Sequence, residues 1–236
     1  MGKQSVKKFT IIVAGGSGTR MNSTLPKQFL LLNGKPILMR TIEQFLKIEG
    51  CKIILVLPKS EQPYWLNKVA ENHPSSEVFK NERITVANGG ATRFQSVKNG
   101  LSAINSDEGI VAVHDGVRPV ISVELIENAF AEAAIHGAVV TSVALKDSIR
   151  EICSSGENRA VDRRNFRLIQ TPQIFDIQLL KSAYEQEEKP SFTDDASVVE
   201  AMGENITLIE GDYKNIKITT PEDMIVAEAF LEHLPR

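Results

Sequence analysis

Residues 13–29 read VAGGSGTRMNSTLPKQF and combine a flexible backbone with positive charge. Gly15, Gly16 and Gly18 follow a hydrophobic run, and Arg20 and Lys27 come shortly afterwards. A glycine-rich turn after a strand leaves backbone N–H groups able to wrap a polyphosphate, and cations beside it can neutralise phosphate charge. The stretch therefore predicts a site for phosphate chemistry. The alternative is an ordinary tight turn with surface cations.

Two common glycine motifs do not fit this stretch. The dinucleotide fingerprint G-x-G-x-x-G/A can start at Gly16, but its third position is Met21. No acidic residue ends a second strand about twenty residues further on, as that fingerprint requires. The P-loop needs a lysine directly after a glycine, whereas Lys27 follows Pro26. These mismatches argue against a nicotinamide-dependent dehydrogenase and against a P-loop nucleotidase.

The elements that must position this loop have the pattern of an α/β fold. Amphipathic segments alternate with short β-branched runs that are too uniformly apolar for a one-sided sheet. One predicted helix opens at Pro36 and places Leu38, Ile42, Phe45 and Leu46 on one face, and another runs from a cap at Thr220 to about Leu234. The alternation predicts βαβ units around a mostly parallel sheet. The predicted strands cover residues 9–14, 52–57, 83–87, 109–115 and 138–145.

Length and composition exclude several classes of protein. The 236 residues suit one domain, and the formal net charge of −3 gives no broad basic face for nucleic acid or an anionic membrane. Cys51 and Cys153 stand far apart, and no cysteine or histidine spacing indicates a metal site. No apolar stretch approaches the roughly 20 residues of a membrane span. We expect a soluble, cytoplasmic protein without a disulfide framework.

Residues 146–170 interrupt the alternation with a dense set of charges around a CSSGENR turn. The pattern predicts two strands joined by a polar turn, which form a projecting hairpin. A hairpin alone is marginally stable and usually packs against something else. A mobile surface loop is the alternative.

Two residues outside the opening loop stand at positions that favour ligands. Asp115 ends a predicted central strand, where open α/β sheets bind ligands, and its carboxylate can hold a ribose hydroxyl or help to organise Mg²⁺. Lys217 is a cation inside the otherwise strand-like run NIKIT, where it costs stability unless an anion meets it. Beside Asp115, His114 is expected to be structural, and Arg118 suits a loop-fixing salt bridge or a ligand contact equally.

The chain resembles a known family along nearly its whole length. AGGSGTRM (14–21) followed by LPKQFLLLNGKPIL (25–38) is similar to the motif of sugar and polyol phosphate nucleotidyltransferases. Further motifs occur in the order and approximate spacing of the 2-C-methyl-D-erythritol 4-phosphate cytidylyltransferases. They are NGGATRFQSV (88–97), VAVHDGVRP (111–119), VDRRNF (161–166), QTPQIF (170–175), FTDDAS (192–197) and NIKITTPED (215–223).

The resemblance implies a Rossmann-like, GT-A-like nucleotidyltransferase domain over residues 1–236 and transfer of CMP from CTP to 2-C-methyl-D-erythritol 4-phosphate, with release of pyrophosphate. Arg20 and Lys27 would stabilise charge in the transition state, and Arg163 and Lys217 would hold the attacking phosphate. The implied nucleotide-binding residues are Ala14, Gly15, Gly16, Ser17, Gly18, Thr19, Gly90, Ala91, Ser96 and Asp115.

The same resemblance implies a set of substrate and partner contacts. Thr171 and Thr193 would join Asp115, Arg163 and Lys217 around the polyol phosphate, in a step of non-mevalonate isoprenoid precursor biosynthesis. Mg²⁺ or another divalent cation would bridge the triphosphate, with Asp115 as an indirect ligand. The 146–170 arm would embrace a second subunit and form a homodimer, with neither nucleic acid nor membrane as a partner.

Two other functions remain open from the sequence. Ribitol-5-phosphate cytidylyltransferases share QTPQ and the first loop, and VDRRNF, with Arg163 eight residues before Thr171, is the feature that favours the methylerythritol enzymes. A non-catalytic module would bind CTP without turning it over. The presence of both Arg20 and Lys27 argues against such a module.

Overall fold

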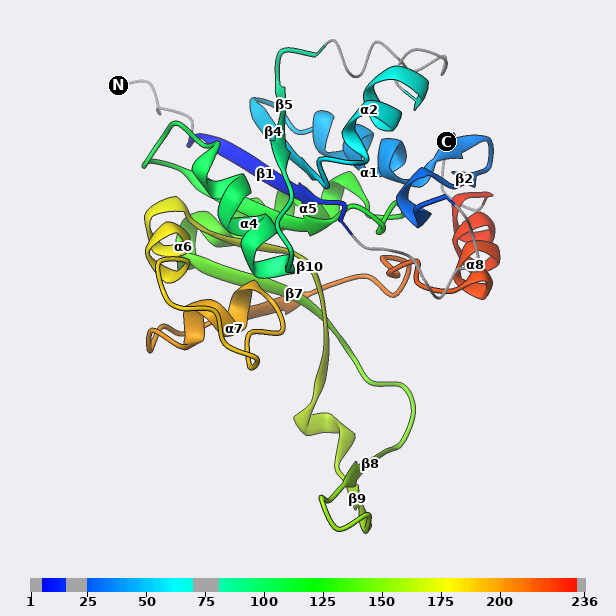
Figure 1. Ribbon diagram of the computed structural model, residues 1–236. Coiled ribbons are helices and arrows are strands. Elements are labelled where there is room, and N and C mark those ends of the chain that lie inside the picture. The colour runs from blue at the N-terminus through cyan, green and yellow to red at the C-terminus, as the bar shows by residue number, and fades with distance from the viewer. Residues whose placement is uncertain (1–5, 16–24, 70–80, 233–236) are drawn as a thin grey trace.

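One seven-stranded sheet forms the centre of the computed structural model, which describes residues 6–15, 25–69 and 81–232 (Figure 1). The strand order is β11-β7-β10-β6-β1-β4-β5, and only β10 runs antiparallel to its neighbours. The mostly parallel α/β fold expected from the alternation is therefore confirmed. The five predicted strands are β1 (Lys8–Val13), β4 (Cys51–Leu57), β5 (Ile84–Asn88), β6 (Ile110–Asp115) and β7 (Ala138–Ala144); β10 (Arg167–Asp176) and β11 (Thr207–Glu210) complete the sheet.

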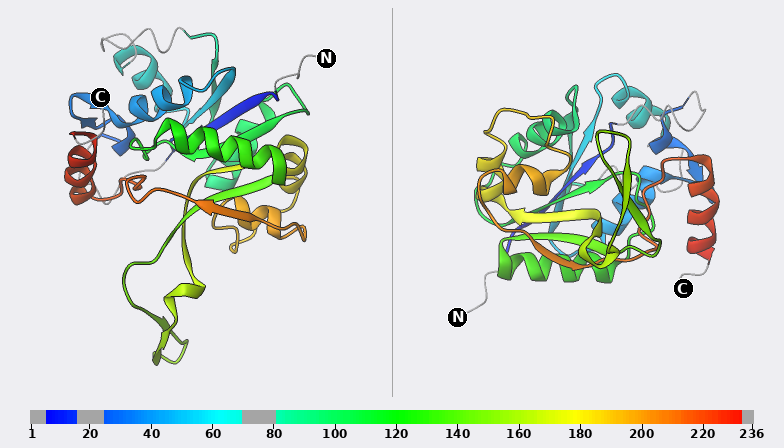
Figure 2. Two further views of the ribbon diagram at one scale, coloured as in Figure 1. Left: turned by 180° about the vertical axis from the view of Figure 1, so that it is seen from behind. Right: turned by 90° about the horizontal axis from the view of Figure 1, so that it is seen from below.

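Helices cover both faces of the sheet, and the two further views in Figure 2 show the resulting layers. On one face, α1 (Ile37–Leu46) and α5 (Val123–His136) pack on alternate strand residues that include Ile12. On the other face, the neighbouring Ile11 belongs to a second apolar cluster. Because successive strand residues point to opposite faces, uniformly apolar strands are needed to fill both clusters. The helices of the second face are α4 (Arg93–Ser102), α6 (Ile177–Ala183) and α7 (Asp195–Glu200).

The two predicted helices are present. Helix α1 begins directly after Pro36 and buries Leu38, Ile42 and Phe45. Helix α8 (Pro221–Glu232) begins where expected, and the Asp223 carboxylate accepts hydrogen bonds from the N–H groups of Thr219 and Thr220, each at 2.8 Å. Five further short elements lie between residues 27 and 69. They are η2 (Lys27–Phe29), β2 (Leu31–Leu32), β3 (Lys35–Pro36), α2 (Gln62–Tyr64) and the π-helical η3 (Trp65–Val69).

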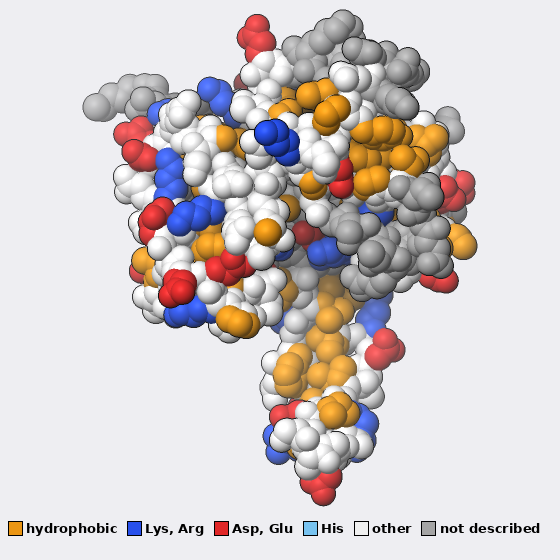
Figure 3. All heavy atoms as spheres, viewed as in Figure 1, with side chains coloured by type: hydrophobic (Ala, Val, Ile, Leu, Met, Phe, Trp, Pro, Cys, Tyr) orange, Lys and Arg blue, Asp and Glu red, His pale blue; other side chains and the backbone are white. Residues whose placement is uncertain are grey.

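The charged segment forms the predicted hairpin, which projects as an arm from the body (Figure 1). Strands β8 (Ile149–Ile152) and β9 (Asn158–Val161) pair antiparallel, and the short helix η5 (Arg163–Asn165) leads back into β10. At the root of the arm, Arg167 donates to the Ser142 carbonyl at 2.8 Å and pairs with Glu210. Figure 3 shows apolar side chains along the arm. The exposed apolar residues of the arm and its root include Ile152, Phe166, Leu168 and Ile169.

The described part of the chain contains no helix long and apolar enough to cross a membrane.

Candidate active site

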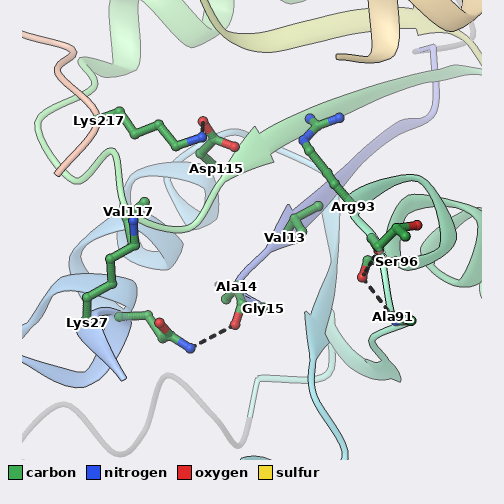
Figure 4. Close-up of a pocket in the computed structure, with 13 residues that line it drawn as sticks. Val13, Ala14, Gly15, Lys27, Ala91, Arg93, Ser96, Asp115, Val117 and Lys217 are labelled. Carbon is green, nitrogen blue, oxygen red and sulfur yellow. Dashed lines mark hydrogen bonds and ion pairs between the residues drawn. The ribbon is translucent and has the colours of Figure 1, made fainter. Parts of the chain in front are cut away.

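A hollow of about 330 Å³ opens where β1 and β6 end (Figure 4). Parallel strands bring their carboxyl ends to one edge of the sheet, and this edge is where α/β folds bind ligands. We call the cavity at this edge the first hollow. Its lining residues are Val13, Ala14, Gly15, Lys27, Gln28, Gly90, Ala91, Thr92, Arg93, Ser96, Asp115, Val117 and Lys217.

The first hollow brings together most of the predicted nucleotide-binding residues. Ala14 and Gly15 directly follow β1, and Asp115 is the last residue of β6. Gly90 and Ala91 come from the β5–α4 connection, and Ser96 comes from the first turn of α4. Lys27 and Lys217 also line it. The predicted residues Gly16, Ser17, Gly18, Thr19 and Arg20 lie outside the described residues.

The β5–α4 loop is held in shape by its own polar groups. The Gly90 N–H donates to Ser96 Oγ at 3.0 Å, and that hydroxyl donates to the Thr92 carbonyl at 2.8 Å. The Ala91 N–H donates to Gln95 Oε1 at 3.1 Å. Thr92, rather than Ser96, caps helix α4. The N–H groups of Gly90 and Ala91 are thus bound to side chains of the first turn of α4, whereas the carbonyl oxygens of these two residues accept no hydrogen bond from any described residue.

Gly90 permits this loop because a side chain has no room there. A Cβ on Gly90 would lie 2.3 Å from Gln95 Cβ and 2.9 Å from the Gln95 backbone carbon. Both distances are far inside van der Waals contact. Any larger residue must therefore displace the loop or the start of α4.

Lys27 is buried on η2 beside the first hollow, where its Nζ donates to the Ile218 carbonyl at 3.1 Å. The next residue, Gln28, donates to the Ala14 carbonyl at 3.0 Å and to Glu61 Oε2 at 2.6 Å. Gln28 therefore ties η2 to the end of β1. No role was predicted for Gln28 from the sequence, although it is the neighbour of Lys27 in the PKQ segment.

Asp115 is the centre of a charged cluster. Its Oδ2 lies 3.1 Å from Arg118 Nε and 3.1 Å from Lys217 Nζ. Burial by itself would raise the pKa of Asp115, but the charges of Lys217, Arg118 and Arg93 outweigh burial and hold that pKa well below its usual range.

Two expectations about the cations of this cluster can be compared with the structure. Arg118 was expected to form a salt bridge or a ligand contact, and the structure contains the salt bridge, to Asp115. Residues 215–219 form no strand, so the strand-like run expected around Lys217 was wrong; Lys217 is 46% exposed and meets Asp115 instead.

A second hollow of about 290 Å³ adjoins the first. The two share three residues, Arg93, Asp115 and Lys217, which form their boundary. In Figure 4, Asp115 lies between Lys217 and Arg93. The other residues of the second hollow are Arg118, Ile169, Gln170, Thr171, Gln173, Thr193 and Asp194.

The QTPQ segment supplies the second hollow with residues fixed by separate partners. Gln170 donates to the Asp212 carbonyl at 2.8 Å, and Gln173 donates to Asp194 Oδ2 at 2.8 Å. Thr171 Oγ1 accepts from the Asp115 N–H at 3.0 Å. The predicted contacts Thr171 and Thr193 are therefore brought together with Lys217, as the resemblance implied.

His114 precedes Asp115 on β6 and is fully buried. Burial is the main cause that lowers its pKa to about 3, so the ring is neutral near pH 7. Its Nε2 faces the Arg118 carbonyl at 3.4 Å, and its Nδ1 lies 3.2 Å from Thr171 Oγ1. A carbonyl can only accept, so Nε2 carries the proton and Nδ1 accepts from the Thr171 hydroxyl. The structural role expected for His114 fits these contacts.

Arg163 does not line either hollow of its own chain. It is exposed on η5 and donates to the Lys146 carbonyl within the arm. Arg93, in contrast, lines both hollows, although no role was predicted for it from the sequence. Its position directly after a glycine loop, at the start of a helix, is a signal of the kind that singled out Arg20 and Lys27.

Comparison with known proteins identifies the family of this chain. A model of the 2-C-methyl-D-erythritol 4-phosphate cytidylyltransferase family matches residues 9–233. The chain belongs to this family. The cytidylyltransferase of that name from Bacteroides fragilis is 51% identical over 222 residues, which are 94% of this chain and 98% of the relative. The one from Bacteroides thetaiotaomicron is 48% identical over 227 residues, covering 96% of this chain and 100% of the relative.

Solved structures of cytidylyltransferases share the fold. The 4-diphosphocytidyl-2C-methyl-D-erythritol synthase of Anaerococcus prevotii superposes with a TM-score of 0.79 at 31% identity, over 96% of this chain and 97% of the other. The 2-C-methyl-D-erythritol 4-phosphate cytidylyltransferase of Francisella tularensis gives 0.76 at 30% identity, over 95% and 99%. The resemblance stated from the sequence motifs is confirmed.

Proposed function

We propose that the first hollow binds CTP, that the second binds 2-C-methyl-D-erythritol 4-phosphate, and that CMP is transferred across their boundary. Membership of the family makes the protein a cytidylyltransferase of isoprenoid precursor biosynthesis. The observation that carries the placement is the shared boundary of Arg93, Asp115 and Lys217 between a glycine-loop hollow and a threonine-lined hollow.

The reaction needs no nucleophilic side chain. A phosphate oxygen of the polyol phosphate forms a bond to the α-phosphorus of CTP, and the bond from that phosphorus to the pyrophosphate oxygen breaks with its electron pair. Negative charge gathers on the α-phosphoryl oxygens and on the leaving pyrophosphate. Catalysis therefore consists of positioning and preorganised positive charge. Lys27 supplies one such positive charge beside the first hollow. Arg20 remains a prediction as the source of another positive charge at the triphosphate.

Cytosine is selected by the loop carbonyls. Because the N–H groups of Gly90 and Ala91 already donate to side chains of α4, the carbonyl oxygens of these two residues are the groups left to meet the base. The amino group of cytosine is a donor at the position where uracil has an acceptor oxygen. A uracil there would place two acceptors against each other and leave both unpaired.

The second hollow suits a phosphorylated polyol. Lys217 offers the cation for the attacking phosphate, and Thr171 and Thr193 offer hydroxyl groups for the polyol chain. The Thr171 hydroxyl donates to His114 and accepts from the Asp115 N–H, so one lone pair of its oxygen is left to accept from a substrate hydroxyl.

The donor set also suits a divalent cation carried by the triphosphate. Mg²⁺ is commonly held by one or two carboxylates together with substrate phosphates, and Asp115 is the one carboxylate that lines the first hollow among the described residues. Those residues contain no cluster of three or more metal-ligating side chains. Asp115 would therefore help to hold a metal whose other ligands are phosphate oxygens and water, and the metal would neutralise triphosphate charge.

The arm suits a two-fold homodimer. Its apolar residues, which include Ile152 at 70% exposure, need a surface to cover them. Arg163 lines neither hollow of its own chain, so its predicted contact with the polyol phosphate requires the hollow of a partner subunit. In such a dimer each active site would be shared between two chains.

A pyrophosphate-release assay tests the proposed function. CTP and UTP are each crossed with 2-C-methyl-D-erythritol 4-phosphate and with ribitol 5-phosphate. We expect the fastest release with CTP and the methylerythritol substrate, with CTP preferred over UTP by about 10²-fold or more. Faster release with ribitol 5-phosphate would reassign the acceptor. Binding of CTP without any release would identify a non-catalytic module.

A further inference from the structure

Arg93 is a cation at the boundary of the two hollows that no step described so far uses. It is the first residue of α4, and its side chain is 30% exposed. Together with Asp115 and Lys217 it lines both hollows. A cation at this boundary lies beside the phosphoryl group that the proposed reaction transfers between the two hollows.

The inner edge of the Arg93 guanidinium is held by a buried network. Its Nη1 and Nη2 donate to Oδ1 and Oδ2 of Asp195 at 2.9 and 2.6 Å. Asp195 is fully buried and also accepts from the Tyr184 hydroxyl at 2.6 Å. Burial raises the pKa of Tyr184, which keeps that hydroxyl protonated as a donor. The Tyr184 ring stacks on Phe94 with ring centroids 4.6 Å apart.

Such a network is an expensive way to stabilise a fold. Taking a carboxylate and a guanidinium out of water costs several kcal/mol per ion, and an apolar replacement is often as stable. What the network does provide is orientation, because a bidentate pair fixes the plane of the guanidinium. The guanidinium has five N–H donors, two of which bind Asp195. The remaining three have no acceptor among the described residues.

We propose that Arg93 is a catalytic residue that binds phosphate oxygens at the boundary in the transition state, and that Asp195 and Tyr184 are its positioning residues. The proposal rests on the proposed function. The new bond to the α-phosphorus forms across this boundary, so the developing charge lies beside a cation that reaches both hollows. Arg93 stays protonated and transfers no proton, and the electron pair of the broken bond leaves with pyrophosphate.

Substitution of Arg93 separates this role from simple substrate binding. An interaction made mainly in the transition state lowers kcat and kcat/KM together and leaves KM nearly unchanged. We expect Arg93→Ala to lower kcat by about 10²-fold, the scale for one preorganised stabiliser. The KM values for CTP and for the polyol phosphate should each change by less than about threefold. Arg93→Lys keeps the charge, loses the planar fork, and should recover only part of the loss.

Chemical rescue distinguishes catalysis from structural support. In Arg93→Ala, the space beside Asp195 can hold a free guanidinium ion, so millimolar guanidinium chloride should raise kcat by about tenfold or more. Combining Asp195→Asn with Arg93→Ala should abolish this rescue, because the anchoring carboxylate is lost. Tyr184→Phe keeps the stacked ring, and should lower kcat less than Arg93→Ala does.

Arg83 offers a matched control. It also donates from both terminal nitrogens, to the carbonyls of Ile48 and Leu46 at 3.1 and 2.7 Å, and it lines neither hollow. Arg83→Ala should lower the melting temperature but leave kcat unchanged and unresponsive to guanidinium.

The outcomes can be told apart from failure of the proposed function. Wild-type turnover is measured first, and its absence would remove the proposed function itself. With an active wild type, an Arg93→Ala enzyme with normal kcat would overturn the inference. So would a loss that guanidinium does not relieve in protein whose melting curve is that of the wild type. If Arg93→Ala does not fold, Arg93→Lys decides, and a wild-type kcat in that variant overturns the inference.

Discussion

Lys217 Nζ lies 3.1 Å from Asp115 Oδ2 at the boundary of the two hollows, and the two residues come from distant parts of the chain. Asp115 has a second cation, Arg118, at the same distance, whereas Lys217 is 46% exposed and can turn toward a ligand. An arriving phosphate therefore competes with Asp115 for Lys217, while Arg118 keeps the buried carboxylate paired.

The first prediction is that Lys217→Met weakens acceptor binding without unfolding the protein. The KM for 2-C-methyl-D-erythritol 4-phosphate should rise by about tenfold or more, with the KM for CTP changed by less than about threefold. Lys214→Met is the control, since that lysine lines neither hollow. Steady-state kinetics with each substrate varied in turn provides the measurement. Equal increases in both KM values would contradict the assignment.

Lys27 should contribute to the chemical step. Its Nζ is held at the first hollow by the Ile218 carbonyl, so Lys27→Ala removes a preorganised charge. We expect kcat to fall by about 10²-fold or more. The same result is predicted for Arg20→Ala. Rapid-mixing measurements of a single turnover report the chemical step directly, and near-wild-type rates would remove the residue from the mechanism.

Gly90→Ala should damage nucleotide binding. The added Cβ would lie 2.3 Å from Gln95 Cβ, so the loop that carries the proposed base contacts must move. We expect the Kd for CTP, measured by calorimetry, to rise by about tenfold or more, and the KM for the polyol phosphate to stay within about threefold. Wild-type CTP affinity in this variant would show that the loop does not contact the base.

The buried His114 predicts how stability depends on pH. Its pKa is lowered to about 3 in the folded protein, mainly by burial, whereas an unfolded chain has a histidine pKa near 6.5. As pH falls below about 6.5, the unfolded state binds the proton first, so folding stability is lost down to about pH 3. One proton gives a slope of at most about 1.4 kcal/mol per pH unit.

Urea unfolding at pH 7, 6 and 5 measures this slope in the wild type and in His114→Gln. The variant should be less stable at pH 7 but should lose less stability on acidification. His136→Gln, at a partly exposed helix position, is the control and should keep the wild-type slope. An unchanged slope in His114→Gln would assign the pH dependence to other groups.

Subunit mixing tests the shared active site. Arg163→Ala and Lys27→Ala proteins should each be nearly inactive alone. If Arg163 serves the partner's hollow, a mixed dimer contains one site with both defects and one with neither. Activity should then return to about a quarter of wild type when half of the dimers are mixed. No recovery, with subunit exchange confirmed by mass measurement, would place Arg163 in its own chain's site or outside the mechanism.

Features that depend on local pattern could be predicted from the sequence. The five core strands have uniformly apolar runs because they are buried on both faces, and α1 begins at a proline that suits a first turn. The glycine loop and Lys27 could be recognised because their chemistry is concentrated in one short stretch. Motif order along the chain then sufficed to identify the family.

Contacts between distant segments were decided by the tertiary structure. Strand β10 inserts antiparallel between β6 and β7, a pairing that no local period encodes. Arg93 and Asp195 are 102 residues apart, and each looks like an ordinary surface charge until the two helix starts meet. Lys217 lines both hollows although the strand expected around it is absent. The physical reason is that a side chain's neighbours, and with them its burial and charge balance, depend on how the whole sheet is assembled.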